Sequence, residues 1–314
     1  MDYTMWDPNL GNISLRKAVN TVLGIGNSWF VNELTGSDSN PGTLGAPFAT
    51  LAAAQAAAVA NNGDTVYLIG SYHIGATLTW AKNGVNLVSL SAPSQNGRGR
   101  ISPTSGLATA FSPLVNVTAQ GCNFLGIGTF HGGFTGATGS QVCWAEAGGR
   151  NHYGRCDFLG GGDATTAALA GMRSLTIAGQ GENEFDDCVI GLDTIVRATN
   201  ANASLELLSG TPRNLMQRPV FRANVSDTAD VHILVGASGM DRDLTLVDPM
   251  FINQVGSGAS TMAAAISMNT AAGGLILMKR PLSVGATALA TSGNVYIDGN
   301  AIGATTTGIA ILAT

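Results

Sequence analysis

Short strand-like segments that recur through most of the chain constrain the fold more than any other feature. From Thr65 to about Asn253, runs rich in Val, Ile, Leu, Thr and Phe alternate with turns rich in Gly, Asn, Asp and Ser. No helical pattern of useful length separates these runs, which argues against alternating strands and helices. The sequence therefore predicts an all-β fold. The clearest segments are Thr65–Ile69, Val85–Leu90, Leu114–Thr118, Ser174–Ile177, Ser204–Leu207, Val231–Val235 and Leu244–Val247.

A weak internal repeat favours a solenoid over a β-sandwich. The run CNFLG at 122–126 recurs as CDFLG at 156–160, and a shorter echo, CVIG, follows at 188–191. A period of about 30 residues is typical of repeat architectures. In a β-helix, like residues stack at the same inward position of successive turns, so we expect Cys122, Cys156 and Cys188 to form an inward column. The alternative is a chance similarity in a chain rich in glycine and strand formers.

Two short helices are predicted before the strand series begins. Ser14 is a suitable N-cap for a helix within an N-terminal arm, residues 1–28. A second, Ala-rich helix follows Thr50 and extends to about residue 60, where Asn61-Asn62-Gly63 ends it.

The sequence around this second helix resembles the entry module of pectate-lyase-like β-helix proteins. The resemblance is carried by TGSDSNPGT at 35–43, APFATL at 46–51, GDTVYL at 63–68 and GSY at 70–72. It implies a right-handed parallel β-helix over residues 29–255. A parallel β-helix has an open apolar end, and the helix near 51–60 is expected to cap it.

The C-terminal segment, residues 256–314, is apolar and nearly without charge. Runs such as AAAI at 263–266 and GLILM at 274–278 would be poorly soluble on a free surface, so we expect this β-rich segment to serve packing or oligomerisation. Residues 271–287 and 294–299 resemble the ends of β-helix proteins carried in tailed-phage structural modules.

The composition excludes several classes of protein. Charged residues make up 11% of the chain, against roughly 25% in an average domain, and the mean hydropathy is +0.22. No run reaches the ~18 apolar residues of a membrane span, and no basic cluster suggests a nucleic-acid partner. The first residues lack the features of a secretory signal, so we expect synthesis in a host cytoplasm.

The four cysteines, Cys122, Cys143, Cys156 and Cys188, show no metal-site or redox spacing. We expect free thiols in the core, and we expect neither a cofactor nor a metal.

The densest acidic run is the candidate metal site that the sequence favours over two smaller clusters, Asp157 with Asp163 and Asp241 with Asp243. In ENEFDDC at 182–188, strand alternation would place Glu182, Glu184 and Asp186 on one face, where three carboxylates could bind a cation. A row of this kind is more often a solvated face. No catalytic residue is predicted, because no two carboxylates, and no histidine with an acidic or cysteine partner, form a recognisable catalytic pattern.

Three other residues are weaker candidates for a functional site. His152 is the one candidate among the histidines, because it lies in the polar run GRNHY. Trp80 and Trp144 are the best candidates for a sugar-stacking platform, although core packing explains them equally well.

Two functional hypotheses remain. The first is a phage virion structural protein, a capsid decoration or cement protein that forms a homotrimer on the capsid surface and contacts the major capsid protein. The alternative is a tailspike or fibre protein that binds or degrades glycans. A bacterial surface adhesin would need export, for which the N-terminus offers no route.

Overall fold

The computed structural model describes residues 26–90, 100–136, 138–197, 202–254, 259–291, 294–298, 300–301 and 311–312. The predicted arm with its helix after Ser14 lies almost entirely outside the described residues. No helix among those described is long and apolar enough to cross a membrane.

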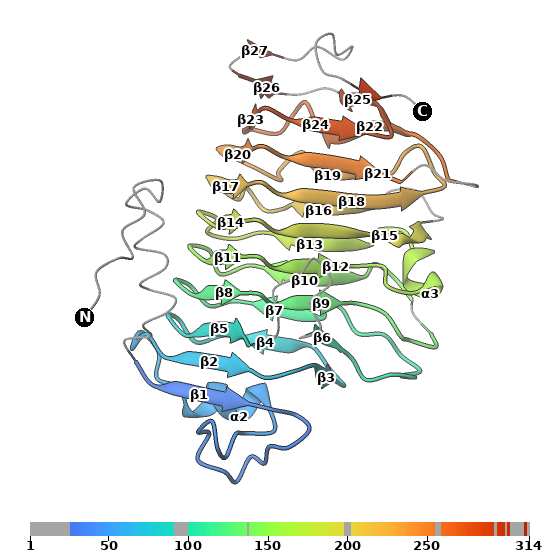
Figure 1. Cartoon of the computed structure of the whole chain (residues 1–314). Helices are drawn as coiled ribbons and strands as arrows, with labels where there is room; N and C mark the ends of the chain where they lie inside the picture. The colour runs from blue at the N-terminus through green and yellow to red at the C-terminus, as the bar shows by residue number, and fades with distance from the viewer. Residues whose placement is uncertain are drawn as a thin grey trace.

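The strands form three long sheets that wind around a common axis (Figure 1). Each turn contributes one strand to each sheet, and every described pair is parallel except β26 with β27. The first sheet contains β1 (Ser28–Val31), β2 (Thr65–Leu68), β5 (Asn86–Ser89), β8 (Asn123–Leu125), β11 (His152–Gly154), β14 (Glu184–Asp186), β17 (Asn214–Gln217), β20 (Asp243–Val247), β23 (Leu275–Lys279), β26 (Val295–Ile297) and β27 (Asn300–Ala301).

The other two sheets complete each turn. The second sheet contains β3 (Tyr72–Ile74), β6 (Arg100–Pro103), β9 (Gly128–Phe130), β12 (Asp157–Leu159), β15 (Val189–Arg197), β18 (Val220–Val225), β21 (Met250–Asn253), β24 (Leu282–Val284) and β28 (Ile311–Leu312). The third contains β4 (Leu78–Trp80), β7 (Val115–Val117), β10 (Val142–Glu146), β13 (Arg173–Ile177), β16 (Ala203–Leu207), β19 (Val231–Val235), β22 (Met262–Met268) and β25 (Ala286–Ala290). The prediction of an all-β, right-handed parallel β-helix is confirmed.

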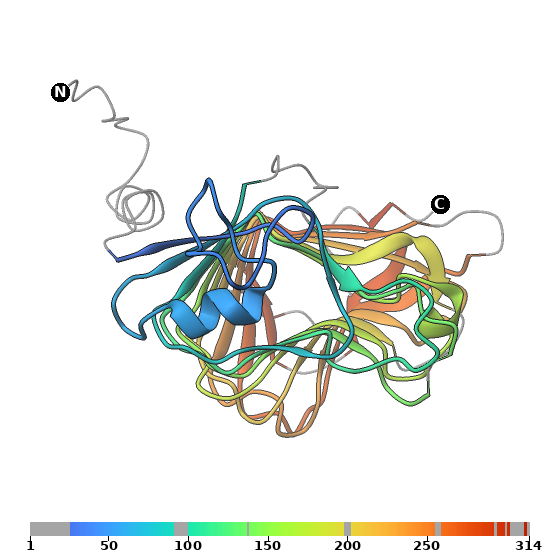
Figure 2. The ribbon, with the colours of Figure 1, turned by 90° about the horizontal axis from the view of Figure 1, so that it is seen from below.

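The predicted capping helix is present as α2 (Leu51–Ala57), and it is shorter than expected. The Thr50 side chain accepts a hydrogen bond from the backbone N–H of Ala53, which satisfies one free donor of the first turn. Leu51 and Ala54 are fully buried, so α2 presents an apolar face to the first turns. Figure 2 shows the helix lying across this end of the solenoid. A second helix, α3 (Ala164–Ala167), was not predicted.

Aromatic rings stack along the lumen. Phe124, Tyr153 and Phe185 occupy the same position on β8, β11 and β14, with ring centroids 4.8 and 4.6 Å apart and planes within 8° of parallel. Phe221 and Phe251 repeat this contact in the second sheet at 5.0 Å. Successive parallel strands lie about 4.8 Å apart, so equal side chains meet face to face.

The predicted cysteine column is only partly correct. Cys156 and Cys188 do occupy equivalent corners of successive turns, because the N–H of Val189 bonds the carbonyl of Cys156 at 2.9 Å. Cys122 lies at a different corner, where its N–H donates to Oδ1 of Asn151 on the next turn. The sequence match was misleading because it aligned β8 of the first sheet with β12 of the second.

The corner that Cys122 occupies belongs to an asparagine ladder. The N–H of Asn151 donates to Oδ1 of Asn183, and the N–H of Asn183 donates to Oδ1 of Asn214. All three side chains are buried. The ladder satisfies backbone donors that the bend from the third to the first sheet would otherwise leave unpaired.

From β8 to β24, each turn from the first to the second sheet is two residues long and begins with a residue at positive φ. These residues are Gly126, Arg155, Asp187, Arg218, Asp248 and Arg280. From Arg155 onward their charges alternate, and Arg218 lies 2.6 Å from Asp187, as Arg280 does from Asp248. These pairs are exposed, so solvent screens them and each contributes little to stability.

The described part of the C-terminal segment continues the solenoid. β22, β23, β24 and β25 extend all three sheets, and Met262, Ile266 and Ile276 are fully buried. Burial in the lumen explains the apolar composition of these strands. A role of the segment in oligomerisation stays a prediction.

Replacement of Phe185 by Ala should reduce the free energy of unfolding by about 3–5 kcal/mol, because it removes a fully buried ring together with its contacts to Tyr153 and Phe158. Urea denaturation measures the loss. Leu277→Ala on the outer face of β23, where the side chain is 37% exposed, is the control and should cost much less. Equal losses would contradict the column.

All four thiols should be unreactive in the folded protein. Every cysteine is buried, and burial raises the pKa of Cys122 to about 11 and that of Cys143 to about 12. A colorimetric disulfide reagent at pH 8 should label none before denaturant is added and all four afterwards. Rapid labelling of the native protein would contradict the assignment of these residues to the lumen.

Candidate functional site

The structure brings the predicted acidic residues together with His152. Phe185 points into the lumen, so Glu184 and Asp186 project from the outer face of β14. His152 lies beside Glu184 on the neighbouring strand, and its Nε2 is 3.0 Å from Oδ2 of Asp186.

Glu182 does not share that face, since it lies in the preceding turn at a φ of 57°. Its two carboxylate oxygens are 2.8 Å from Arg150 and 2.5 Å from Arg213, and these hydrogen bonds lower the pKa of Glu182. Glu184 accepts a hydrogen bond from Gln217 at 3.1 Å.

The acidic row is therefore already paired within the protein. Nε2 of His152 is hydrogen-bonded to Oδ2 of Asp186, and the other ring nitrogen, Nδ1, is buried. This arrangement leaves no histidine nitrogen for a substrate. In the part of the chain that the structure describes, no group of His, Cys, Asp and Glu is arranged to hold a metal ion.

Trp80 and Trp144 cannot serve as sugar platforms. Both are fully buried, and Trp144 packs edge-on against Phe124 and Tyr153 in the aromatic column. Of the two explanations that the sequence left open, core packing is correct.

A second polar cluster lies inside the solenoid, between the second and third sheets. Arg197 donates to the hydroxyl of Ser204 at 3.1 Å, and His232 follows Ser204 one turn later. Burial, together with the charge of Arg197, lowers the pKa of His232 to about 3. These side chains are shielded from solvent, so the cluster contributes to the packing of the lumen and offers no open surface.

Below neutral pH, His232 should reduce stability. The pKa of His232 is about 6.5 in the unfolded chain and about 3 in the folded protein. Between pH 6.5 and pH 3, the unfolded state therefore binds a proton that the folded state does not bind. Stability is therefore lost as the pH falls through this window, by up to about 1.4 kcal/mol per pH unit from this group.

Urea titrations from pH 7 to pH 3 test this effect. His232→Phe should show a flatter dependence than the parent, whereas Phe251→Leu, which changes a neighbouring ring and keeps His232, should retain the dependence of the parent. Identical curves for the parent and His232→Phe would refute the assignment.

The outer face of the third sheet presents a different surface. Ser174 and Leu175 are both fully buried in the lumen, which leaves Arg173 and Thr176 on the outer side of β13. The strand register places Thr176 in a column of outward residues, one from each turn of the solenoid. Its members are Thr79, Asn116, Ala145, Thr176, Glu206, Leu234 and Ser267.

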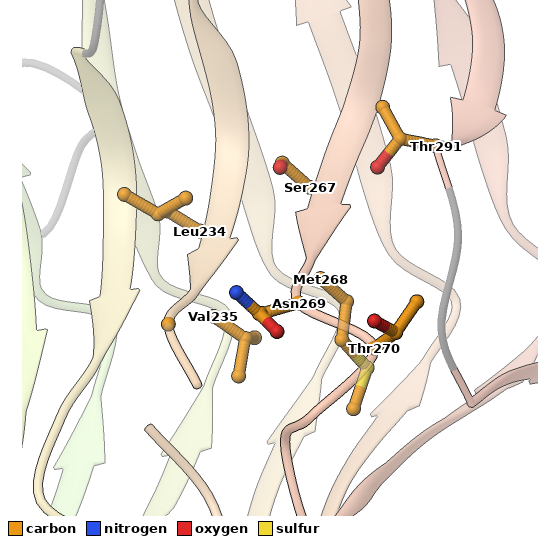
Figure 3. A pocket seen from close by; sticks show the side chains of 8 residues that line it. Leu234, Val235, Ser267, Met268, Asn269, Thr270 and Thr291 are labelled. Carbon is orange, nitrogen blue, oxygen red and sulfur yellow. The ribbon is translucent and has the colours of Figure 1, made fainter. Parts of the chain in front are cut away.

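This column leads into a shallow hollow of about 360 Å³ (Figure 3). Leu234 and Ser267 come from neighbouring strands, Asn269 and Thr270 from the turn after β22, and Thr291 from the following turn of the solenoid. We call this feature the third-sheet hollow. Its lining is completed by Val235, Gly236 and Met268.

The lining combines apolar surface with uncharged hydrogen-bonding groups. Hydroxyls of Ser and Thr and the amide of Asn can both donate and accept hydrogen bonds, and the partly exposed Leu234 side chain provides a surface for C–H groups. Sequence reasoning did not identify these residues. The hollow forms because strand pairing brings together residues about 30 positions apart, such as Leu234 and Ser267, and no local sequence motif indicates this pairing.

The fold is shared with pectin methylesterases and a pectate lyase. No family model and no curated protein matches the sequence significantly. Among solved structures, a pectin methylesterase in complex with a hexasaccharide has a TM-score of 0.55 and 13% identity, over 88% of this chain and 90% of that one. Pectin methylesterase PemA from Erwinia chrysanthemi has a TM-score of 0.52 and 15% identity, over 86% and 80% of the two chains.

The pectate lyase Pel9A has a TM-score of 0.52 and 14% identity, over 90% of this chain and 81% of that chain. The TM-scores show a common fold, and identities this low say nothing about a shared activity. The chain is a parallel β-helix of the pectate-lyase-like architecture.

Proposed function

We propose that this protein binds polysaccharide on the outer face of its third sheet, with the third-sheet hollow as a sugar-binding subsite. One observation carries the proposal. The hollow offers uncharged hydroxyl and amide groups beside the apolar side chain of Leu234, a combination that matches a sugar ring with polar edges and C–H faces.

The form of the surface fits an extended ligand. Outward side chains of the column repeat at each turn, about 4.8 Å apart, from Thr176 through Glu206 and Leu234 to Ser267. A polymer can therefore contact successive turns in a regular way. The polysaccharide-active β-helix enzymes that share the fold support the same class of ligand.

The proposal is confined to recognition. Hydrolysis of a glycosidic bond generally needs two suitably spaced carboxyl groups, and the residues that line the hollow include none. Glu206, one turn away on the column, is bonded to Arg173 at 2.7 Å. Turnover is therefore not part of the proposed function.

The capsid-decoration hypothesis gains no support from the described residues or from the solved structures with the same fold. Those structures favour its alternative as far as glycans are concerned, a protein that binds or degrades polysaccharide, while a tailspike or fibre stays a prediction. A major capsid protein partner, a homotrimer and a virion location stay predictions.

Filling the hollow should abolish binding. Affinity electrophoresis through gels that contain dextran, galactomannan, arabinan or polygalacturonate measures retardation of the folded protein. At least one polymer should retard the parent, and Ser267→Trp should weaken that binding at least about tenfold because the indole occupies the subsite. Leu277→Trp, on the outer face of the first sheet, is the matched control and should bind normally.

Two results would contradict the proposed function. In one, no polymer retards the folded parent. In the other, the two tryptophan variants lose binding equally, which would place the binding surface elsewhere.

A further inference from the structure

An ion pair lies on the outer face of the third sheet, beside the hollow. Nε of Arg173 is 2.7 Å from Oε2 of Glu206 on the next turn, and the guanidinium also donates to the carbonyl of Met172 at 2.9 Å. The Arg173 side chain is 7% exposed and that of Glu206 is 20% exposed. Glu206 is thus the more exposed partner, and it neutralises the arginine charge.

The position of this pair relates it to the hollow. Glu206 is in register with Leu234, and Leu234 is in register with Ser267, so the carboxylate lies one turn from the lining. A polymer that occupies the hollow and extends along the column would meet Glu206 next.

Other charges near the hollow give no compensating attraction for anions. None of the described lining residues is ionisable. The turn that follows Gly236 carries Asp241 and Arg242, which lie 3.4 Å apart, so their charges cancel.

We infer that Glu206 is a specificity-determining residue, which masks Arg173 and so makes the surface select uncharged polysaccharides over polymers of uronic acids. The inference rests on the proposed function for its ligand class. Uronate polymers carry repeated carboxylates, and carboxylates are bound by guanidinium groups in paired hydrogen bonds. Here the nearby guanidinium is occupied by a carboxylate of the protein itself, and a second carboxylate would be repelled.

The inference predicts a gain of binding, which general damage to the fold does not produce. Glu206→Ala removes both the charge and the cover over Arg173. Polygalacturonate and its methyl-esterified form are suitable probes because they share a backbone and differ in charge. Affinity of the folded variant for polygalacturonate should rise at least about tenfold over the parent, and added salt should reverse the gain. The esterified form should show no such gain.

Two further variants locate the effect. Arg173→Gln combined with Glu206→Ala should lose the new affinity, since the guanidinium that creates it is gone. Glu206→Gln, which keeps the volume and removes the charge, should show a smaller gain. Circular dichroism and a thermal unfolding midpoint establish that each variant is folded.

The outcomes separate the inference from the proposed function. A parent that binds polygalacturonate as tightly as its best neutral polymer overturns the inference and leaves polysaccharide binding intact. A Glu206→Ala variant that is folded and gains no affinity for polygalacturonate also overturns it. If the parent binds no polymer, the proposed function fails, while the gain in Glu206→Ala still measures the masking of Arg173.

Discussion

Register between successive parallel strands is the constraint on which the rest of this structure depends. Because each strand hydrogen-bonds to its equivalent on the next turn, a residue chosen at one position is repeated in space about every 4.8 Å. Inside, the repetition produces the stack of Phe124, Tyr153 and Phe185, and at one corner it produces the asparagine ladder. One-residue slips would reverse the inward and outward faces, so the columns also fix the register that creates them.

The same repetition organises the charged surface. The chain has few ionisable residues, and most of those on the outer faces meet an opposite charge one turn away, as Asp187 does with Arg218 and Glu206 with Arg173. Such pairing also engages Glu182 and Asp187 at the two ends of the acidic run, which sequence alone presents as a cluster of carboxylates. The third-sheet hollow differs because its polar groups are uncharged and lie beside apolar side chains.

Sequence reasoning predicted the architecture well and the site poorly, for a physical reason. Alternation, turn residues and the module around α2 are local signals, so the β-helix and its cap could be predicted. The contact between His152 and Asp186 depends on a 32-residue register offset between Gly154 and Asp186, which the irregular turn lengths conceal. The same irregularity produced the false equivalence of Cys122 with Cys156. Burial of Trp80 and Trp144 likewise depends on which face each strand turns toward the lumen.

Hydrogen–deuterium exchange with and without the polysaccharide that retards the protein most tests the account's central claim directly. Bound polymer should slow exchange in peptides that cover residues 234–236 and 267–270, because these segments line the hollow. Peptides that cover 152–154 and 184–186 on the first sheet should exchange at unchanged rates. Protection of the first-sheet peptides with no effect at the hollow would contradict the account.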